Sequence, residues 1–127
     1  MDVGGVVSLN GLGELEAAVM DVLWQTDEPL RVREVLNRLT GRTLAYTTVM
    51  TVLDNLHRKQ WVLRNKSGKA YHYRPAGSRE ELVARTLRRM LETSLQPDVV
   101  LLHFARSASD RELTVLRQVL DERSDRR

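Results

Sequence analysis

The chain has 127 residues, of which 42% are apolar and 29% are charged, and it contains no cysteine. This length suits one compact domain, or one small domain with a helical appendage, and the composition excludes collagen-like, low-complexity and wholly disordered classes. The lack of cysteine excludes a disulfide scaffold, cysteine-ligated zinc and thiol catalysis. No stretch approaches the roughly 18 to 20 apolar residues of a membrane span, and no signal peptide is recognisable. We therefore expect a cytoplasmic protein without membrane insertion.

The net charge of +3 is distributed unevenly along the sequence. Residues 1–41 carry a net charge of −4 and residues 75–127 carry +1. Residues 42–74, in contrast, hold seven basic side chains against Asp54 alone, a net charge of +6. A basic segment of this kind indicates a surface for a polyanion, although an ordinary solvated face would carry the same charge.

Three amphipathic segments occupy the first half of the chain. Apolar side chains recur at spacings of three and four within residues 12–23, 32–39 and 49–56, which predicts three helices. Pro29 ends the first of them and Gly41 the second, and the third runs from about Tyr46 to Lys59.

The period changes between Trp61 and Tyr73. Two short strand-like runs flank the polar stretch 65–69, which contains Gly68, and they predict a β-hairpin. Tyr71 and Tyr73 share one strand face and Trp61 could oppose them across the pair, but packing of the hairpin onto the helices is the favoured role of these rings. Three helices followed by a basic hairpin form a winged helix-turn-helix, which we place at residues 1–76.

The remaining residues, 77–127, predict three more helices. Ser78 with Glu81 forms a capping box, Pro97 suits a first helical turn, and Ser109 with Glu112 forms a second capping box. The apolar stripes of these helices are too large for so small an isolated segment. Three short helices could bury them within one chain, but exchange with a second copy fits better. We therefore predict a helical dimerisation domain, and a protein that is mainly α with a small β-hairpin wing. The side chains predicted to form the dimer interface are Leu87, Met90, Leu91, Leu102, Phe104, Leu113, Leu116 and Leu120.

The third helix carries the most informative polar residues. Thr47, Thr48, Thr51 and Asn55 lie on one face, opposite the apolar stripe. Thr offers a hydroxyl and a methyl group to base edges, and Asn can pair with adenine, so this face predicts base contacts in a DNA major groove. A polar solvent face is the alternative, but such a face carries Glu and Lys more often than Thr.

Basic and aromatic side chains surround this face. Tyr46 either contacts a phosphate or fastens the start of the helix, and Arg64 and Arg74 lie on the predicted hairpin, within reach of an adjacent backbone. The candidate phosphate contacts are Arg42, Tyr46, Arg58, Lys59, Lys66 and Lys69.

Catalytic chemistry finds little support in the sequence. His57, His72 and His103 are scattered without a metal-binding spacing, and no glycine-rich phosphate loop follows a strand. We expect no enzyme activity, no metal and no cofactor.

The stretch Ala45-Tyr-Thr-Thr-Val-Met-Thr-Val-Leu53, followed by Leu56 and Lys59, resembles the recognition-helix signature of the BlaI/MecI penicillinase-repressor family. Leu12-Gly-Glu-Leu-Glu16 resembles the first-helix signature of the family, and Tyr71-x-Tyr73-x-Pro75 resembles the end of its wing. The resemblance covers essentially the whole chain.

This resemblance implies a homodimeric transcriptional repressor that binds palindromic operators with TACA/TGTA half-sites, typically upstream of β-lactam-resistance genes. In the staphylococcal branch, a membrane sensor triggers cleavage at an Asn-Phe bond of the dimerisation domain. The matching pair here is His103-Phe104, which keeps the phenylalanine and lacks the asparagine. It is the candidate cleavage position, and a sensor protease is the candidate partner.

Two other functions are compatible with the same residues. One is a winged-helix regulator whose C-terminal helices enclose a small molecule. The other is a winged-helix module that binds a protein and never contacts DNA; it predicts no salt-dependent affinity for DNA.

Overall fold

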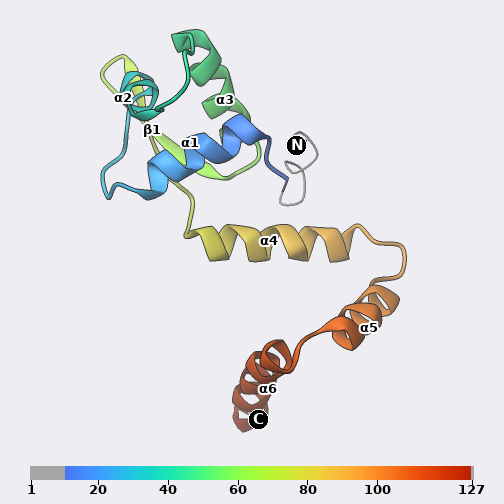
Figure 1. Ribbon diagram of the computed structural model, residues 1–127. Coiled ribbons are helices and arrows are strands. Elements are labelled where there is room, and N and C mark those ends of the chain that lie inside the picture. Colours follow the sequence, from blue (N-terminus) through green and yellow to red (C-terminus); the bar gives the residue numbers. More distant parts are fainter. Residues whose placement is uncertain (1–10, 127) are drawn as a thin grey trace. The chain divides into compact units, whose positions relative to one another are not determined.

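The computed structural model describes residues 11–126, so the expectation about an N-terminal signal lies outside the described residues. The chain divides into two compact units, the first ending at Thr86 and the second beginning at Leu87. Figure 1 shows the order of the elements. Their bounds are α1 Glu14–Trp24, α2 Val32–Arg38, α3 Tyr46–Arg58, β1 Val62–Ser67, β2 Ala70–Pro75, α4 Arg79–Glu92, α5 Pro97–Ser107 and α6 Asp110–Asp125. This order confirms the predicted mainly helical class with a hairpin wing.

The core of the first unit lies between α1, α2 and α3. Each helix buries the apolar stripe that its periodicity predicts, because side chains three and four positions apart share one helix face. Val19, Val35, Val49, Leu53 and Leu56 are fully buried there. The Thr-rich face of α3 therefore points away from the core by necessity.

The hairpin is longer and its turn tighter than the sequence predicted. Ser67 pairs with Ala70, so Gly68 and Lys69 alone form the turn, and the expected loop over residues 65–69 was wrong. Gly68 has a φ of +64°, which suits the first position of a two-residue turn. Residues with a Cβ atom rarely adopt this angle, so glycine is favoured here. Leu30 forms an isolated antiparallel bridge to this hairpin: its amide donates to the carbonyl of Tyr73 at 2.9 Å, and its carbonyl accepts from the amide of Tyr73 at 2.8 Å.

Trp61 does not oppose the tyrosines and instead packs onto a helix, which is the favoured prediction for this ring. It precedes β1, is buried, and packs edge-on against Trp24 with ring centroids 6.3 Å apart. The residue opposite Tyr73 is Arg64. The indole of Trp24 donates a hydrogen bond to the carbonyl of Gly77 at 3.0 Å, which ties α1 to the segment that follows the wing.

The first half of α4 belongs to the first unit. Ser78 and Glu81 form the predicted capping box, with bonds of 2.8 and 3.0 Å. Leu82 is buried in the core, and Arg79 pairs with Asp21 of α1 at 2.7 Å. The predicted domain boundary after residue 76 lies before α4, whereas the first compact unit runs on to Thr86.

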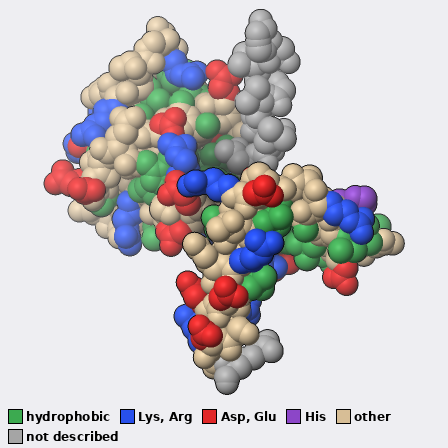
Figure 2. All heavy atoms as spheres, turned by 60° about the horizontal axis from the view of Figure 1, so that its bottom comes forward, with side chains coloured by type: hydrophobic (Ala, Val, Ile, Leu, Met, Phe, Trp, Pro, Cys, Tyr) green, Lys and Arg blue, Asp and Glu red, His purple; other side chains and the backbone are tan. Residues whose placement is uncertain are grey.

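The second unit leaves its apolar side chains open. The predicted capping box of Ser109 and Glu112 opens α6. Neither α5 nor α6 buries a residue, and hydrophobic side chains lie open on the surface of this unit (Figure 2). Leu87, Met90, Leu91, Val100, Leu101 and Phe104 line an apolar hollow of about 450 Å³ between the end of α4 and α5. Across residues 11–126, no helix is long and apolar enough to cross a membrane.

Candidate nucleic-acid interface

The polar face of α3 is open to solvent. Thr47, Thr48 and Thr51 are exposed, while Val49 between them and Val52 and Leu53 after them are buried, as the predicted face requires. This face carries hydroxyls and methyl groups without a formal charge. It can therefore approach base edges without placing a carboxylate against the phosphates.

The last turn of α3 is organised by one side-chain contact. The guanidinium of Arg58 donates to the amide oxygen of Asn55, three residues earlier. This bond engages the acceptor of Asn55 and leaves its NH₂ group to donate. The second lone pair of that oxygen can still accept from N6 of an adenine while the NH₂ group donates to N7.

Lys59 already has partners at the start of α1. Its ammonium is 2.7 Å from the carboxylate of Glu16 and 3.0 Å from the carbonyl of Gly11. The same carboxylate accepts the amide of Gly13 at 2.8 Å and so caps α1. Lys59 thereby fastens the C-terminal end of α3 to the start of α1.

Arg42 is loosely paired. Its guanidinium lies 3.7 Å from the carboxylate of Glu14, and both side chains are more than one-third exposed. A surface pair of this kind contributes little stability, so Arg42 can exchange this partner for a phosphate at small cost.

The wing presents two kinds of cation. Lys66 and Lys69 are exposed near the turn. Arg64 instead turns towards α3: its guanidinium is 3.0 Å from the carboxylate of Asp54 and 4.2 Å from the ring centre of Tyr71. A hydrogen bond to the Tyr73 hydroxyl is the main reason that the pKa of Arg64 rises above its usual value. Burial raises the pKa of Tyr73.

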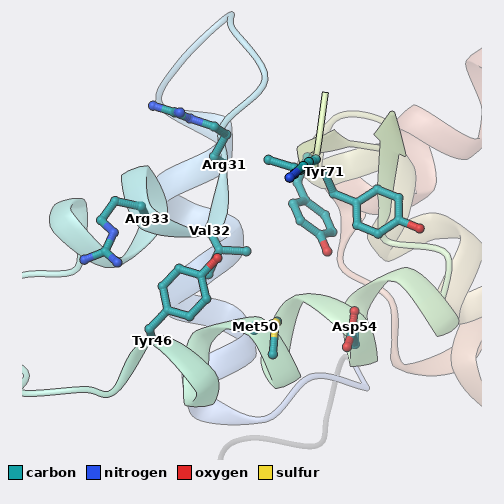
Figure 3. A pocket seen from close by; sticks show the side chains of 10 residues that line it. Arg31, Val32, Arg33, Tyr46, Met50, Asp54 and Tyr71 are labelled. Atoms are coloured by element: carbon teal, nitrogen blue, oxygen red, sulfur yellow. The ribbon is translucent and has the colours of Figure 1, made fainter. Parts of the chain in front are cut away.

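A groove of about 470 Å³ lies between α2, α3 and the wing (Figure 3). Figure 3 shows Tyr46, Met50 and Asp54 along α3, facing residues of α2 and the wing. Arg31, just before α2, and Arg33 of α2 line it, together with Lys69 and Tyr71 of the wing. The guanidinium of Arg33 lies 5.1 Å from the ring centre of Tyr46. Sequence reasoning missed both arginines because they belong to the segment with a net negative charge.

The acidic and histidine side chains of the described residues do not gather as a metal site requires. Within residues 11–126 no three His, Asp or Glu side chains are placed to hold a metal ion. His72 is half-buried on β2, and its Nδ1 has no hydrogen-bond partner.

The first three helices and the hairpin wing that follows them define the winged-helix class. Solved structures share this fold: a MarR family protein from Bacillus stearothermophilus has a TM-score of 0.50 at 18% identity, covering 97% of this chain and 81% of that one. MepR, a transcription regulator of a Staphylococcus aureus multidrug efflux pump, has a TM-score of 0.51 at 18% identity, covering 96% and 84%. At such identities the likeness concerns the fold alone.

The sequence itself identifies the family. Residues 12–122 match the penicillinase repressor family. The transcriptional regulator BlaI of Mycobacterium tuberculosis is 42% identical over 121 residues, which are 92% of this chain and 88% of that protein. The chain belongs to the penicillinase repressor family. It is a DNA-binding transcriptional repressor with a winged helix, and the family is one of regulators, not of enzymes.

Proposed function

We propose that two copies of the chain bind a palindromic operator with TACA/TGTA half-sites and repress transcription by covering the promoter. The regulated genes would be β-lactam-resistance or related genes, and the repressor would act in the cytoplasm. The observation that carries this proposal is the exposed, uncharged face of α3 beside the basic wing.

The base contacts come from Thr47, Thr48, Thr51 and Asn55. The threonine side chains are short, so the helix backbone must approach the floor of the major groove closely, which an uncharged face permits. Thr methyl groups suit the thymines of a TACA/TGTA half-site, and the Asn55 amide suits its adenines.

The phosphate contacts come from the margins of the same surface. Arg42, Tyr46 and Arg58 flank the reading face on α3 and the loop before it, and Lys66 and Lys69 extend it on the wing. Lys59 is left out of this set because its ammonium already holds Glu16 and the carbonyl of Gly11.

The second unit supplies the dimer interface. Leu87, Met90, Leu102, Phe104 and Leu120 are each more than half exposed in the single chain. Apolar side chains so densely placed are stable in water only when a partner covers them, and a second copy of the same helices offers a complementary surface. Leu91, Leu113 and Leu116 complete the proposed interface. A dimer also places two reading helices on one DNA, which a palindrome requires.

His103-Phe104, the candidate cleavage position, lies within α5. Proteases cleave extended segments, so a sensor protease would act on this bond only after α5 unwinds locally. Cleavage there would divide the apolar face that we assign to the dimer.

Fluorescence anisotropy with a TACA/TGTA palindrome and a scrambled duplex of equal length tests the proposal across a salt series. We expect at least about a hundredfold preference for the palindrome, within the range of specific regulators, and two chains per duplex. Equal and steeply salt-dependent binding to both duplexes would discard the operator. No binding to either would favour a protein-binding module.

A further inference from the structure

The groove between α2, α3 and the wing contains one acidic side chain, Asp54, among its described lining residues. Asp54 is also the one acidic residue of the basic segment 42–74. A carboxylate on a surface that binds a polyanion repels the phosphates, so its presence there calls for a structural role. Its position in the groove, between α3 and the wing, indicates such a role.

Asp54 joins α3 to the wing through Arg64. The oxygen-to-nitrogen distance is 3.0 Å, and the exposed fractions of the side chains are 48% for Asp54 and 25% for Arg64. Arg64 in turn lies 4.2 Å from the ring centre of Tyr71, on the neighbouring strand. One guanidinium therefore contacts the reading helix and both strands of the wing, and it neutralises the carboxylate.

The two walls of the groove are rich in cations and hydroxyls. Arg33 lies beside Tyr46 on the helical wall, and Lys69 and Tyr71 line the groove on the wing. Tyr46 and Tyr71 are 40% and 39% exposed, so their phenol groups are accessible. Donors on two facing walls suit a chain of phosphates better than a single small anion.

The position of the groove, between α3 and the wing, indicates which part of a DNA duplex would enter it. When α3 lies in a major groove and the wing reaches the neighbouring minor groove, the sugar-phosphate strand that separates the two must cross the space between helix and wing. We propose that this groove binds one phosphodiester strand of the operator between Arg33 and Lys69, and that the Asp54–Arg64 pair sets its width. The inference rests on the proposed function and adds Arg33 and Tyr71 to the phosphate contacts. Arg64 is a positioning residue in this arrangement.

The inference predicts an effect opposite in sign to simple electrostatics. Asp54→Asn removes a negative charge from the DNA-facing surface, yet it should weaken operator binding, by about fivefold, because the wing loses its anchor on α3. Asp27→Asn is the matched control, since it removes the same charge from an exposed loop outside the groove. The exchanged pair Asp54→Arg with Arg64→Asp should recover much of the lost affinity.

Arg33→Gln tests the occupant of the groove. It should weaken binding by about tenfold and reduce the salt slope by about two per dimer, since each copy loses one phosphate contact. Arg123→Gln, which removes a cation from α6, is its control. Tryptophan fluorescence and circular dichroism establish that each variant is folded.

The operator and the scrambled duplex serve for all of these measurements. Asp54→Asn binding the operator as tightly as Asp27→Asn, or more tightly, would overturn the role of the pair. Arg33→Gln matching Arg123→Gln in affinity and salt slope would overturn the phosphodiester site. Both results presuppose a wild-type protein that prefers the operator, so a failure of the proposed function is recognised separately, in the wild type.

Discussion

Truncating Phe104 to alanine tests whether a second copy covers the second unit. Phe104 is 52% exposed in the single chain. A phenylalanine presents about 200 Å², so about 100 Å² of this side chain remains open on each copy. At about 25 cal/mol per Å², covering it in both copies contributes about 5 kcal/mol at most. Association recovers only part of such area, so we expect a loss of about 3 kcal/mol, a factor of about a hundred in the dimer Kd.

Sedimentation equilibrium over a concentration series measures that Kd directly. Arg106→Ala, on an exposed polar position of the same helix, is the control and should stay within about threefold of wild type. Both tryptophans, Trp24 and Trp61, lie in the first unit, so their fluorescence reports whether that unit stays folded. A Phe104→Ala protein that dimerises as tightly as the control would refute a dimer built on this face.

Three further predictions concern the first unit. Lys66→Ala should weaken binding to operator and random DNA equally and lower the salt slope by about two per dimer; a loss confined to the operator in an anisotropy series would contradict a phosphate role. Glu16→Ala removes the cap of α1 and the partner of Lys59, and should lower the free energy of unfolding in urea by about 1 to 2 kcal/mol. Glu14→Ala should lower it little, and equal losses in the two variants would refute this difference. Burial raises the pKa of Tyr73, so the folded state holds the phenol proton more tightly than the unfolded chain. This contribution is complete below about pH 10 and is lost as the pH rises through the folded pKa. Tyr73→Phe should therefore lose less stability between neutral and strongly alkaline pH than wild type does, and a parallel decline would exclude this cause.

The sequence predicted those features that depend on neighbours along the chain. The helices follow from apolar spacings, and the capping boxes of Ser78 and Ser109 follow from short motifs that close on themselves. The exposed face with Thr47 and Thr51 follows from the same helical period that buries Val49.

Contacts between distant segments could not be predicted in this way. Lys59 was expected to hold a phosphate, but its partner Glu16 lies 43 residues earlier. Nothing in the local pattern distinguishes such a lysine from Lys66. The partner of Trp61 could not be named for the same reason, because Trp24 lies on the distant helix α1.

The groove between α2, α3 and the wing is the clearest example of a feature that the sequence alone could not predict. Its walls come from α2, α3 and the wing, and its cations Arg31 and Arg33 belong to a segment whose net charge is negative. Segment charge is a one-dimensional sum, whereas the field at a surface depends on which side chains the fold brings together.

In the function proposed for this chain, α3 reads bases through its threonines. The most direct measurement compares the Kd of Thr48→Ala for the TACA/TGTA palindrome and for a scrambled duplex, with Thr48→Ser as the variant that keeps the hydroxyl. We predict that Thr48→Ala loses about tenfold or more on the palindrome and little on the scrambled duplex, in keeping with the cost of one base contact, while its fold is unchanged. An equal loss on both duplexes would contradict base reading by this face.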